Sequence, residues 1–233
     1  AIDYISGAAI MIRRDLWEQL GGFDERFAPA YYEDTDLAFQ VRNAGYQVVY
    51  QPASMVVHFE GVSNGTDVKS GEKAFQETNA KKFREKWKDT LETEQNTEGK
   101  DLFRARDRSQ RKKCFLIVDH YVPMYDKDAG SRYMLDYMKL FLKKGYNVKF
   151  LGDNFFASQP YTRSLQQMGV EVIYGDWYAQ HWKEWLKEIG SDLDYVMLSR
   201  PHISVKYIDA VREFSNAKVL YMGHDIHFWR EEM

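Results

Sequence analysis

Residues 114–151 read CFLIVDHYVPMYDKDAGSRYMLDYMKLFLKKGYNVKFL. The first six residues form a short apolar run ending in Asp119, a pattern typical of a strand buried on both faces. Apolar residues then recur every three or four positions over 130–144, which indicates an amphipathic helix. A second apolar run follows over 146–151. A strand, a helix and a strand in this order form a right-handed crossover between parallel strands.

The same alternation continues to the end of the chain. We expect further strands over 170–174, 195–199 and 218–222, with helices over 161–168, 179–189 and 204–214. This pattern predicts an α/β fold, in which residues 113–233 form a Rossmann-like domain with a parallel sheet covered by helices on both faces.

Polar residues follow the predicted strands at their carboxyl ends, where parallel sheets bind ligands. Asp119 and Asp153 end two of the earlier strands in this way. We expect four later residues to line a binding pocket: Arg200, His202, His224 and Asp225. The alternative is that these four are solvated loop residues and salt-bridge partners.

The composition excludes several classes of protein. The chain has 233 residues, of which 44% are hydrophobic, and this is enough for one large domain or two small ones. A net charge of −3 argues against a nucleic-acid binder. A single cysteine, Cys114, excludes an intrachain disulfide framework. No apolar run approaches the roughly 20 residues that span a bilayer. We therefore expect a cytoplasmic protein, and leave open a peripheral contact with the inner face of the membrane.

The first 90 residues follow a different pattern. We expect short strands over 6–12, 46–50 and 55–58, helices that begin near Asp15 and Glu33, and a long helix over 72–90. The chain starts at Ala1 in strand-like sequence, so we expect it to be a piece of a longer polypeptide. Apolar strands without neighbours tend to pair with another chain, and homo-oligomerisation through residues 1–60 is therefore expected.

Residues 91–112 lose this apolar periodicity. The segment 92–98 is acidic, whereas 104–113 is basic. Such a stretch buries too little apolar surface to order itself, which predicts a solvated linker between two domains. Contact of the basic end with anionic lipid headgroups is the alternative.

Residues 31–36, Tyr-Tyr-Glu-Asp-Thr-Asp, place three carboxylates at the start of a helix: Glu33, Asp34 and Asp36. Helix capping accounts for one acid at such a place, but less readily for a cluster of three among aromatic residues. His58 ends an apolar segment, where a buried core histidine is the alternative to a functional one.

Two glycines are further candidates. Gly7 lies in the small-residue segment 6–9, where the backbone could approach a substrate closely; a tight core strand is the alternative. Gly130 opens a helix whose free N–H groups could hold an anion. Because this is one glycine and not a glycine-rich loop, a simple cap is the alternative.

The segments 6–24, 31–42 and 45–61 together closely resemble the second half of a family 2 glycosyltransferase catalytic domain, of the inverting GT-A type. Residues 1–90 are therefore expected to form the C-terminal half of that domain. The resemblance implies that Asp34 deprotonates the acceptor hydroxyl, that Glu33 orients it or binds the acceptor, and that Asp36 caps the helix beside the substrate.

The same resemblance implies a divalent cation, Mg²⁺ or Mn²⁺, on the diphosphate of the donor, with His58 as one ligand. The family's other metal ligand, an Asp-x-Asp motif, has no counterpart before Ser6. Residues 113–233 more loosely resemble the N-terminal, acceptor-handling domain of a family 4 glycosyltransferase of the GT-B type. The resemblance rests on the segments 115–123, 128–132, 145–148, 198–201 and 225–231.

The two resemblances together imply a fragment of a bifunctional enzyme. It would transfer sugar from a nucleotide-sugar donor to a growing polysaccharide or a lipid-linked acceptor, and the pocket at the sheet edge would bind that acceptor. The isolated chain is expected to be inactive, because both donor-binding halves would lie outside it. The alternative is a non-catalytic fragment that binds an acceptor glycan or a partner enzyme.

Overall fold

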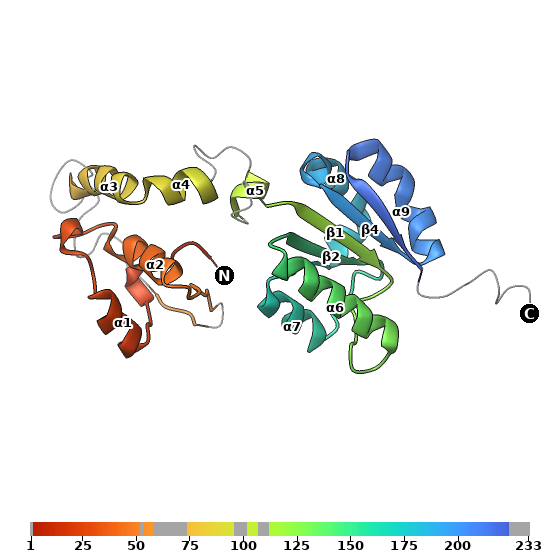
Figure 1. Ribbon diagram of the computed structural model, residues 1–233, viewed down its shortest axis with the longest axis horizontal. Helices are drawn as coiled ribbons and strands as arrows, with labels where there is room; N and C mark the ends of the chain where they lie inside the picture. The colour runs from red at the N-terminus through yellow and green to blue at the C-terminus, as the bar shows by residue number, and fades with distance from the viewer. Residues whose placement is uncertain (1, 52–53, 58–73, 96–101, 107–111, 224–233) are drawn as a thin grey trace, which may run out of the picture. The chain divides into compact units, whose positions relative to one another are not determined.

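The structure is a computed structural model, and it describes residues 2–51, 54–57, 74–95, 102–106 and 112–223. The chain divides into two compact units, Ala1–Leu91 and Glu92–Met233 (Figure 1). The second unit contains a parallel sheet. The first is built from helices and irregular segments.

The sheet of the second unit has five strands, all parallel, in the order β3-β2-β1-β4-β5. The strands are β1 (Cys114–Asp119), β2 (Asn147–Gly152), β3 (Glu171–Ile173), β4 (Tyr195–Ser199) and β5 (Lys218–Met222). Leu116 in the centre of β1 pairs with Lys149 on one side and with Val196 on the other. The predicted α/β fold with a Rossmann-like parallel sheet is confirmed.

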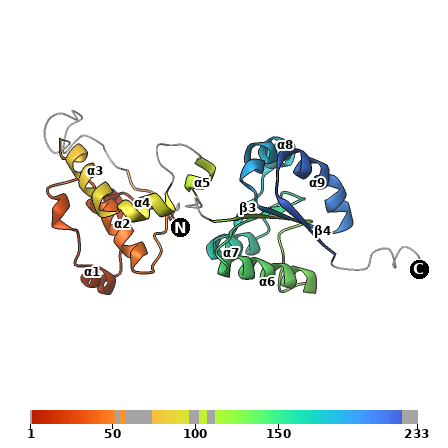
Figure 2. The same cartoon turned by 45° about the horizontal axis from the view of Figure 1, so that its top comes forward.

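Helices cover both faces of this sheet. They are α6 (Ala129–Lys143) and α7 (Tyr161–Met168) on one face, with α8 (Asp176–Ile189) and α9 (Pro201–Phe214) on the other (Figures 1 and 2). Successive residues of β1 point to opposite faces: Phe115 packs in the core beneath α6, whereas Leu116 packs in the core beneath α8 and α9. A strand buried on both sides needs apolar residues at every position, which explains the unbroken apolar run in the sequence.

The direction in which strands are added reverses at the centre of the sheet. From β1 the chain proceeds outward to β2 and then β3, whereas β4 returns to the other side of β1 and is followed by β5. The carboxyl ends of β1 and β4 therefore flank the topological switch point. In open α/β sheets this is the place where ligands bind.

A short helix of the second unit, α5 (Leu102–Arg106), packs against the core of the sheet domain through Phe103. The ring of Phe103 lies 4.3 Å from the ammonium nitrogen of Lys149, a fully buried residue of β2 that also pairs with Glu171. Arg104 donates to Asp192 at 2.7 Å. This part of the predicted solvated linker is thus helical and packed, because the ring of Phe103 over Lys149 and the ion pair between Arg104 and Asp192 anchor it.

The first unit is built around two small apolar clusters. Its helices are the 3-10 turns Gly7–Ala9 and Glu25–Phe27, then α1 (Arg14–Leu20), α2 (Glu33–Asn43), α3 (Ala74–Lys86) and α4 (Lys88–Glu94), the last of which extends past the unit's boundary. One cluster joins Leu16 of α1 to Ala38 and Val41 of α2. The other joins Phe39 of α2 to Phe83 of α3.

The strands predicted for this unit are wrong within its described residues, none of which belongs to a strand. Residues 7–9 form a 3-10 turn, while 46–50 and 55–57 have no regular structure. One backbone hydrogen bond, from the N–H of Ile2 to the carbonyl of Val48 at 2.9 Å, links the amino-terminal segment to 46–50. A strand requires a partner strand, and the described part of this unit supplies none.

The long helix predicted over 72–90 is interrupted at Trp87 and forms α3 and α4. Leu91 of α4 packs beside Phe83 in the aromatic cluster of the first unit. Of the helices in the described ranges, none has the length and apolarity that crossing a membrane requires.

Candidate functional site

The acid cluster lies at the start of α2, as the sequence predicts. Tyr31 and Tyr32 precede it with φ angles of 73° and 74°, a left-handed conformation that is uncommon outside glycine. Tyr32 is the N-cap residue, and its side chain makes no capping hydrogen bond. The carboxylates of the first turn therefore do not occupy the N-cap position, although negative charge there favours the helix through its dipole.

Asp34 is half-buried and is held by the backbone of a distant segment. One carboxylate oxygen accepts a hydrogen bond from the N–H of Gly7 at 2.7 Å, and the other accepts from the N–H of Thr35 at 2.6 Å. A Cβ atom at Gly7 would lie 3.3 Å from the Cβ of Asp34, a tight contact. Gly7 therefore permits a close approach of backbone to carboxylate, and two predicted site residues meet.

Glu33 is also half-buried, and its Oε2 atom is buried. Within the described part of the chain this oxygen has no hydrogen-bond partner. A buried acceptor without a donor costs free energy unless a ligand or water satisfies it. The position is consistent with a carboxylate that accepts a hydrogen bond from a bound hydroxyl.

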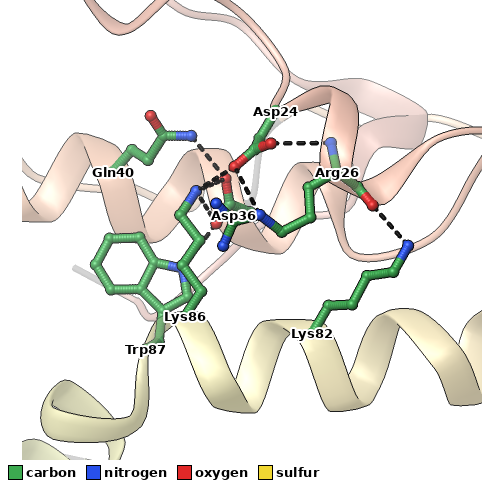
Figure 3. Close-up of polar contacts among 7 residues, drawn as sticks. All are labelled: Asp24, Arg26, Asp36, Gln40, Lys82, Lys86 and Trp87. Carbon is green, nitrogen blue, oxygen red and sulfur yellow. Dashed lines mark hydrogen bonds and ion pairs between the residues drawn. The ribbon is translucent and has the colours of Figure 1, made fainter.

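Asp36 differs from its two neighbours because it is fully buried and faces α3 and α4 (Figure 3). Its carboxylate accepts hydrogen bonds from Lys86 at 2.8 Å, from the indole N–H of Trp87 at 2.7 Å and from Gln40 at 2.6 Å. All of these donors belong to the protein, and the N-cap position of α2 is occupied by Tyr32 and not by Asp36. Through the hydrogen bond from Lys86, the Asp36 side chain connects α2 to α3.

Lys86 also donates to Asp24 at 2.7 Å, so one ammonium group serves two carboxylates. The hydrogen bond from Lys86 holds the pKa of Asp24 below its ordinary value, against the opposing effect of burial. Sequence reasoning missed Lys86 and Trp87, which lie about 50 residues from Asp36 along the chain. Within the helical pattern of 74–86 a lysine is typical of a solvated face.

The second unit places a polar cluster at its switch point. Arg200, which follows β4 and has a φ of 68°, donates from Nε to Asp119 at the end of β1 at 2.9 Å. Nδ1 of His120 lies 3.3 Å from Nε2 of His202, the second residue of α9. Two of the four predicted pocket residues, Arg200 and His202, are thus brought together with residues of β1. The other two, His224 and Asp225, lie outside the described residues.

The contacts at the start of α6 support a simple helix cap rather than the predicted anion-binding site at Gly130. Asp128 is the N-cap residue and accepts hydrogen bonds from the N–H and the hydroxyl of Ser131, at 2.7 and 2.6 Å. Burial works to raise the pKa of Asp128, but these hydrogen bonds outweigh it and the pKa lies below the ordinary value. A carboxylate therefore occupies the helix N-terminus where an anion would bind.

Asp153 follows β2 at the same edge of the sheet, as the sequence indicates. The hydroxyl of Tyr207 in α9 donates to it at 2.7 Å, and Lys206 pairs with it. Burial and this hydrogen bond raise the pKa of Tyr207. Asp153 thus binds α9 to the sheet.

The GT-A resemblance implies a divalent cation with His58 as one ligand. His58 lies outside the described residues, and among those that are described no group of three or more histidine, cysteine, aspartate or glutamate side chains converges on one point.

An open groove of about 1190 Å³ runs through the first unit. Residues of the segments 2–13, 46–51 and 54–56 line it together with one side of α2, and most of these side chains are apolar. Ser6 and Ala8, the neighbours of Gly7, are part of the lining, so the groove passes beside the contact between Gly7 and Asp34.

The chain is similar over short segments to curated proteins. The N-acetylglucosaminyl-diphospho-decaprenol L-rhamnosyltransferase of Mycobacterium tuberculosis is 39% identical over 66 residues, 28% of this chain and 21% of that protein. The O-antigen biosynthesis protein RfbC of Myxococcus xanthus is 33% identical over 63 residues, 27% of this chain and 5% of that protein. The uncharacterized protein y4gI of Sinorhizobium fredii is 33% identical over 61 residues.

No family model matches the chain, and no solved structure matches it. The matched part spans about a fifth of the length of the rhamnosyltransferase. These partial relatives support a glycosyltransferase family for this chain.

Proposed function

We propose that the chain is part of a glycosyltransferase that transfers a sugar from a nucleotide-sugar donor to a glycan or lipid-linked acceptor in cell-envelope polysaccharide synthesis. The names of two partial relatives, a rhamnosyltransferase and an O-antigen biosynthesis protein, support this class. The observation that carries the proposal is the half-buried carboxylate of Asp34, oriented by the backbone N–H groups of Gly7 and Thr35.

Asp34 is the general base of the proposed reaction. Oδ1 accepts hydrogen bonds from both the N–H and the hydroxyl of Thr35, whereas Oδ2 accepts one from the N–H of Gly7 and retains a lone pair for a proton. It takes the proton of the acceptor hydroxyl as that oxygen bonds to the anomeric carbon of the donor. The bond from this carbon to the diphosphate breaks with its electron pair, and the nucleoside diphosphate leaves while the configuration inverts.

Glu33 assists by accepting a hydrogen bond from the acceptor through its buried Oε2, which the described residues leave without a partner. This interaction would orient the attacking hydroxyl and remove the cost of an unpaired buried oxygen. His58 is proposed as one ligand of a divalent cation, which would neutralise charge on the leaving diphosphate.

We assign the first unit to the C-terminal half of a GT-A domain and the second to the N-terminal domain of a GT-B enzyme. The polar cluster at the switch point supports an acceptor site in the second unit, with Arg200 and His202 in contact with the acceptor. We propose that the enzyme acts in the cytoplasm.

The experiment that tests the base is Asp34→Asn in the full-length protein. Turnover is measured as release of nucleoside diphosphate from a panel of nucleotide sugars, including activated L-rhamnose, with polyprenol-diphosphate-linked N-acetylglucosamine as acceptor. Loss of a general base should reduce kcat by about 10²–10⁴-fold.

The matched control is Asp15→Asn, which removes an exposed acid of α1 that pairs with Arg13. This control should retain the activity of the unmodified protein. Turnover of the Asp34→Asn protein within about threefold of the control would exclude Asp34 as the base.

A further inference from the structure

The turn before the acid cluster is conformationally strained. Tyr31 and Tyr32 are consecutive non-glycine residues with φ angles of 73° and 74°. L-residues with a side chain adopt this region at a cost, and such residues persist only where the surrounding structure holds them. Glu33 and Asp34 follow directly, so whatever holds this turn also sets the position of the proposed base.

One buried side chain of α3 holds the turn. The amide nitrogen of Asn79 lies 2.7, 2.8 and 3.0 Å from the carbonyl oxygens of Phe27, Ala30 and Tyr31. An amide nitrogen carries two hydrogens, so the three carbonyls share them. The opposite orientation of the amide would point an oxygen at three other oxygens, which fixes the assignment.

Asn79 is fully buried, and its own oxygen has no hydrogen-bond partner among the described residues. A residue kept for stability alone gains little from this arrangement, because the unpaired oxygen offsets part of the benefit of the donated bonds. The main effect of the Asn79 side chain is to bind the carbonyls of the segment that leads into α2.

Residues at the end of the same helix also bind the chain on the other side of the acid cluster, at Asp36. About two helical turns after Asn79, Lys86 donates to Asp36, and Trp87 donates to it just beyond the end of α3 (Figure 3). The carbonyl of Tyr31 and the carboxylate of Asp36 are therefore both bound from the α3 side, and Asp34 lies between them in the sequence.

We propose that Asn79 is a positioning residue for the transfer reaction, and that it acts by holding the left-handed turn at Tyr31 and Tyr32 so that Asp34 keeps its orientation. This inference rests on the proposed function of Asp34. Asn79 itself touches neither substrate nor cofactor in this role.

The test compares kcat and KM of three variants of the full-length protein, in the assay described for Asp34. Asn79→Leu removes the donor, and we expect kcat to fall by about 10- to 100-fold with KM for the donor little changed, since a misplaced catalytic group slows chemistry more than binding. The matched control is Lys82→Met, which removes a hydrogen bond of 2.8 Å from the same helix to the carbonyl of Arg26. It should keep kcat within about twofold.

A rescue separates positioning from general stability. Glycine adopts a positive φ without strain, so Tyr31→Gly should recover part of the lost kcat in the Asn79→Leu background, and change kcat little alone. A role of Asn79 in stability alone predicts no such recovery. If circular dichroism shows that Asn79→Leu does not fold, Asn79→Ser, which keeps one donor, is compared in the same way.

Two results have distinct meanings. If Asp34→Asn is inactive while Asn79→Leu and Asn79→Ser keep the kcat of the unmodified protein, or if glycine at position 31 gives no recovery, the positioning role is overturned. If Asp34→Asn is fully active, the proposed base is wrong, whatever the Asn79 variants do.

Discussion

Substitution of Lys86 by methionine should strongly destabilise the contact between α2 and α3. Lys86 Nζ lies 2.8 Å from the fully buried carboxylate of Asp36 and 2.7 Å from Asp24. Methionine preserves most of the apolar stem but removes the charge, so Asp36 is left buried without this cation. Removal of one partner from a buried ion pair typically costs 3–5 kcal/mol.

The lower end of that range applies here. The Lys86 side chain is 20% exposed, and Asp36 keeps the hydrogen bonds from Trp87 and Gln40. We therefore expect a loss of about 3 kcal/mol, which should accelerate hydrogen exchange of the protected α2 amides by about 100-fold. Exchange is followed by mass spectrometry on peptides that cover residues 33–43.

Two comparisons make this prediction specific. Lys82→Met removes a more exposed hydrogen bond of the same helix and should change exchange in α2 by less than about fivefold. Asp24→Asn should have a small effect alone and almost none in the Lys86→Met background, because its cation is then missing. A change below 1 kcal/mol for Lys86→Met would show that Asp36 is not held as a buried carboxylate that needs this cation.

Two further predictions concern the second unit and the isolated chain. The hydrogen bond to Asp126, together with burial, raises the pKa of Tyr161 to about 12. The stabilisation from this phenol is then complete below about pH 10, the pKa in the unfolded state, and is lost as the pH rises toward 12. In an ultraviolet titration, the Tyr161→Phe protein should contain one fewer tyrosine that ionises near pH 12 than the unmodified protein. Equal titration of the two proteins near pH 12 would disprove the assignment. The isolated chain should show no nucleotide-sugar turnover and should bind UDP or GDP only weakly with Mn²⁺, whereas tight metal-dependent binding by calorimetry would place a donor site within it.

The sheet of the second unit could be predicted because the apolar pattern of each strand and helix is visible within its own segment of sequence. The run from Cys114 to Asp119 is apolar at every position, and the residues of α6 are apolar at helical spacing, so each element is recognisable without its neighbours. Helix starts were less accurate: α8 begins at Asp176 and α9 at Pro201, both three residues before the predicted positions. The first turn of a helix makes few apolar contacts and so carries a weaker pattern.

The candidate site could be predicted only in part. Glu33 and Asp34 are visible in the sequence because acidic residues gather at a helix start. The roles of Asp36 and Asn79 could not be predicted, because each depends on partners that lie about 50 residues away and a polar residue within a helical pattern is typical of the surface. The strands expected in the first unit failed for a related reason, since pairing depends on a second segment that periodicity does not reveal.

The packing of α5 determines where the two units can be separated for study. Composition alone suggests a cut at residue 113, just before β1. A protein that begins there would lack Phe103 and Arg104, which would remove the aromatic ring that covers the buried ammonium group of Lys149 and the cation paired with Asp192. A protein that begins between α4 and α5 keeps both contacts, and should therefore be the more soluble and the more stable preparation of the sheet domain.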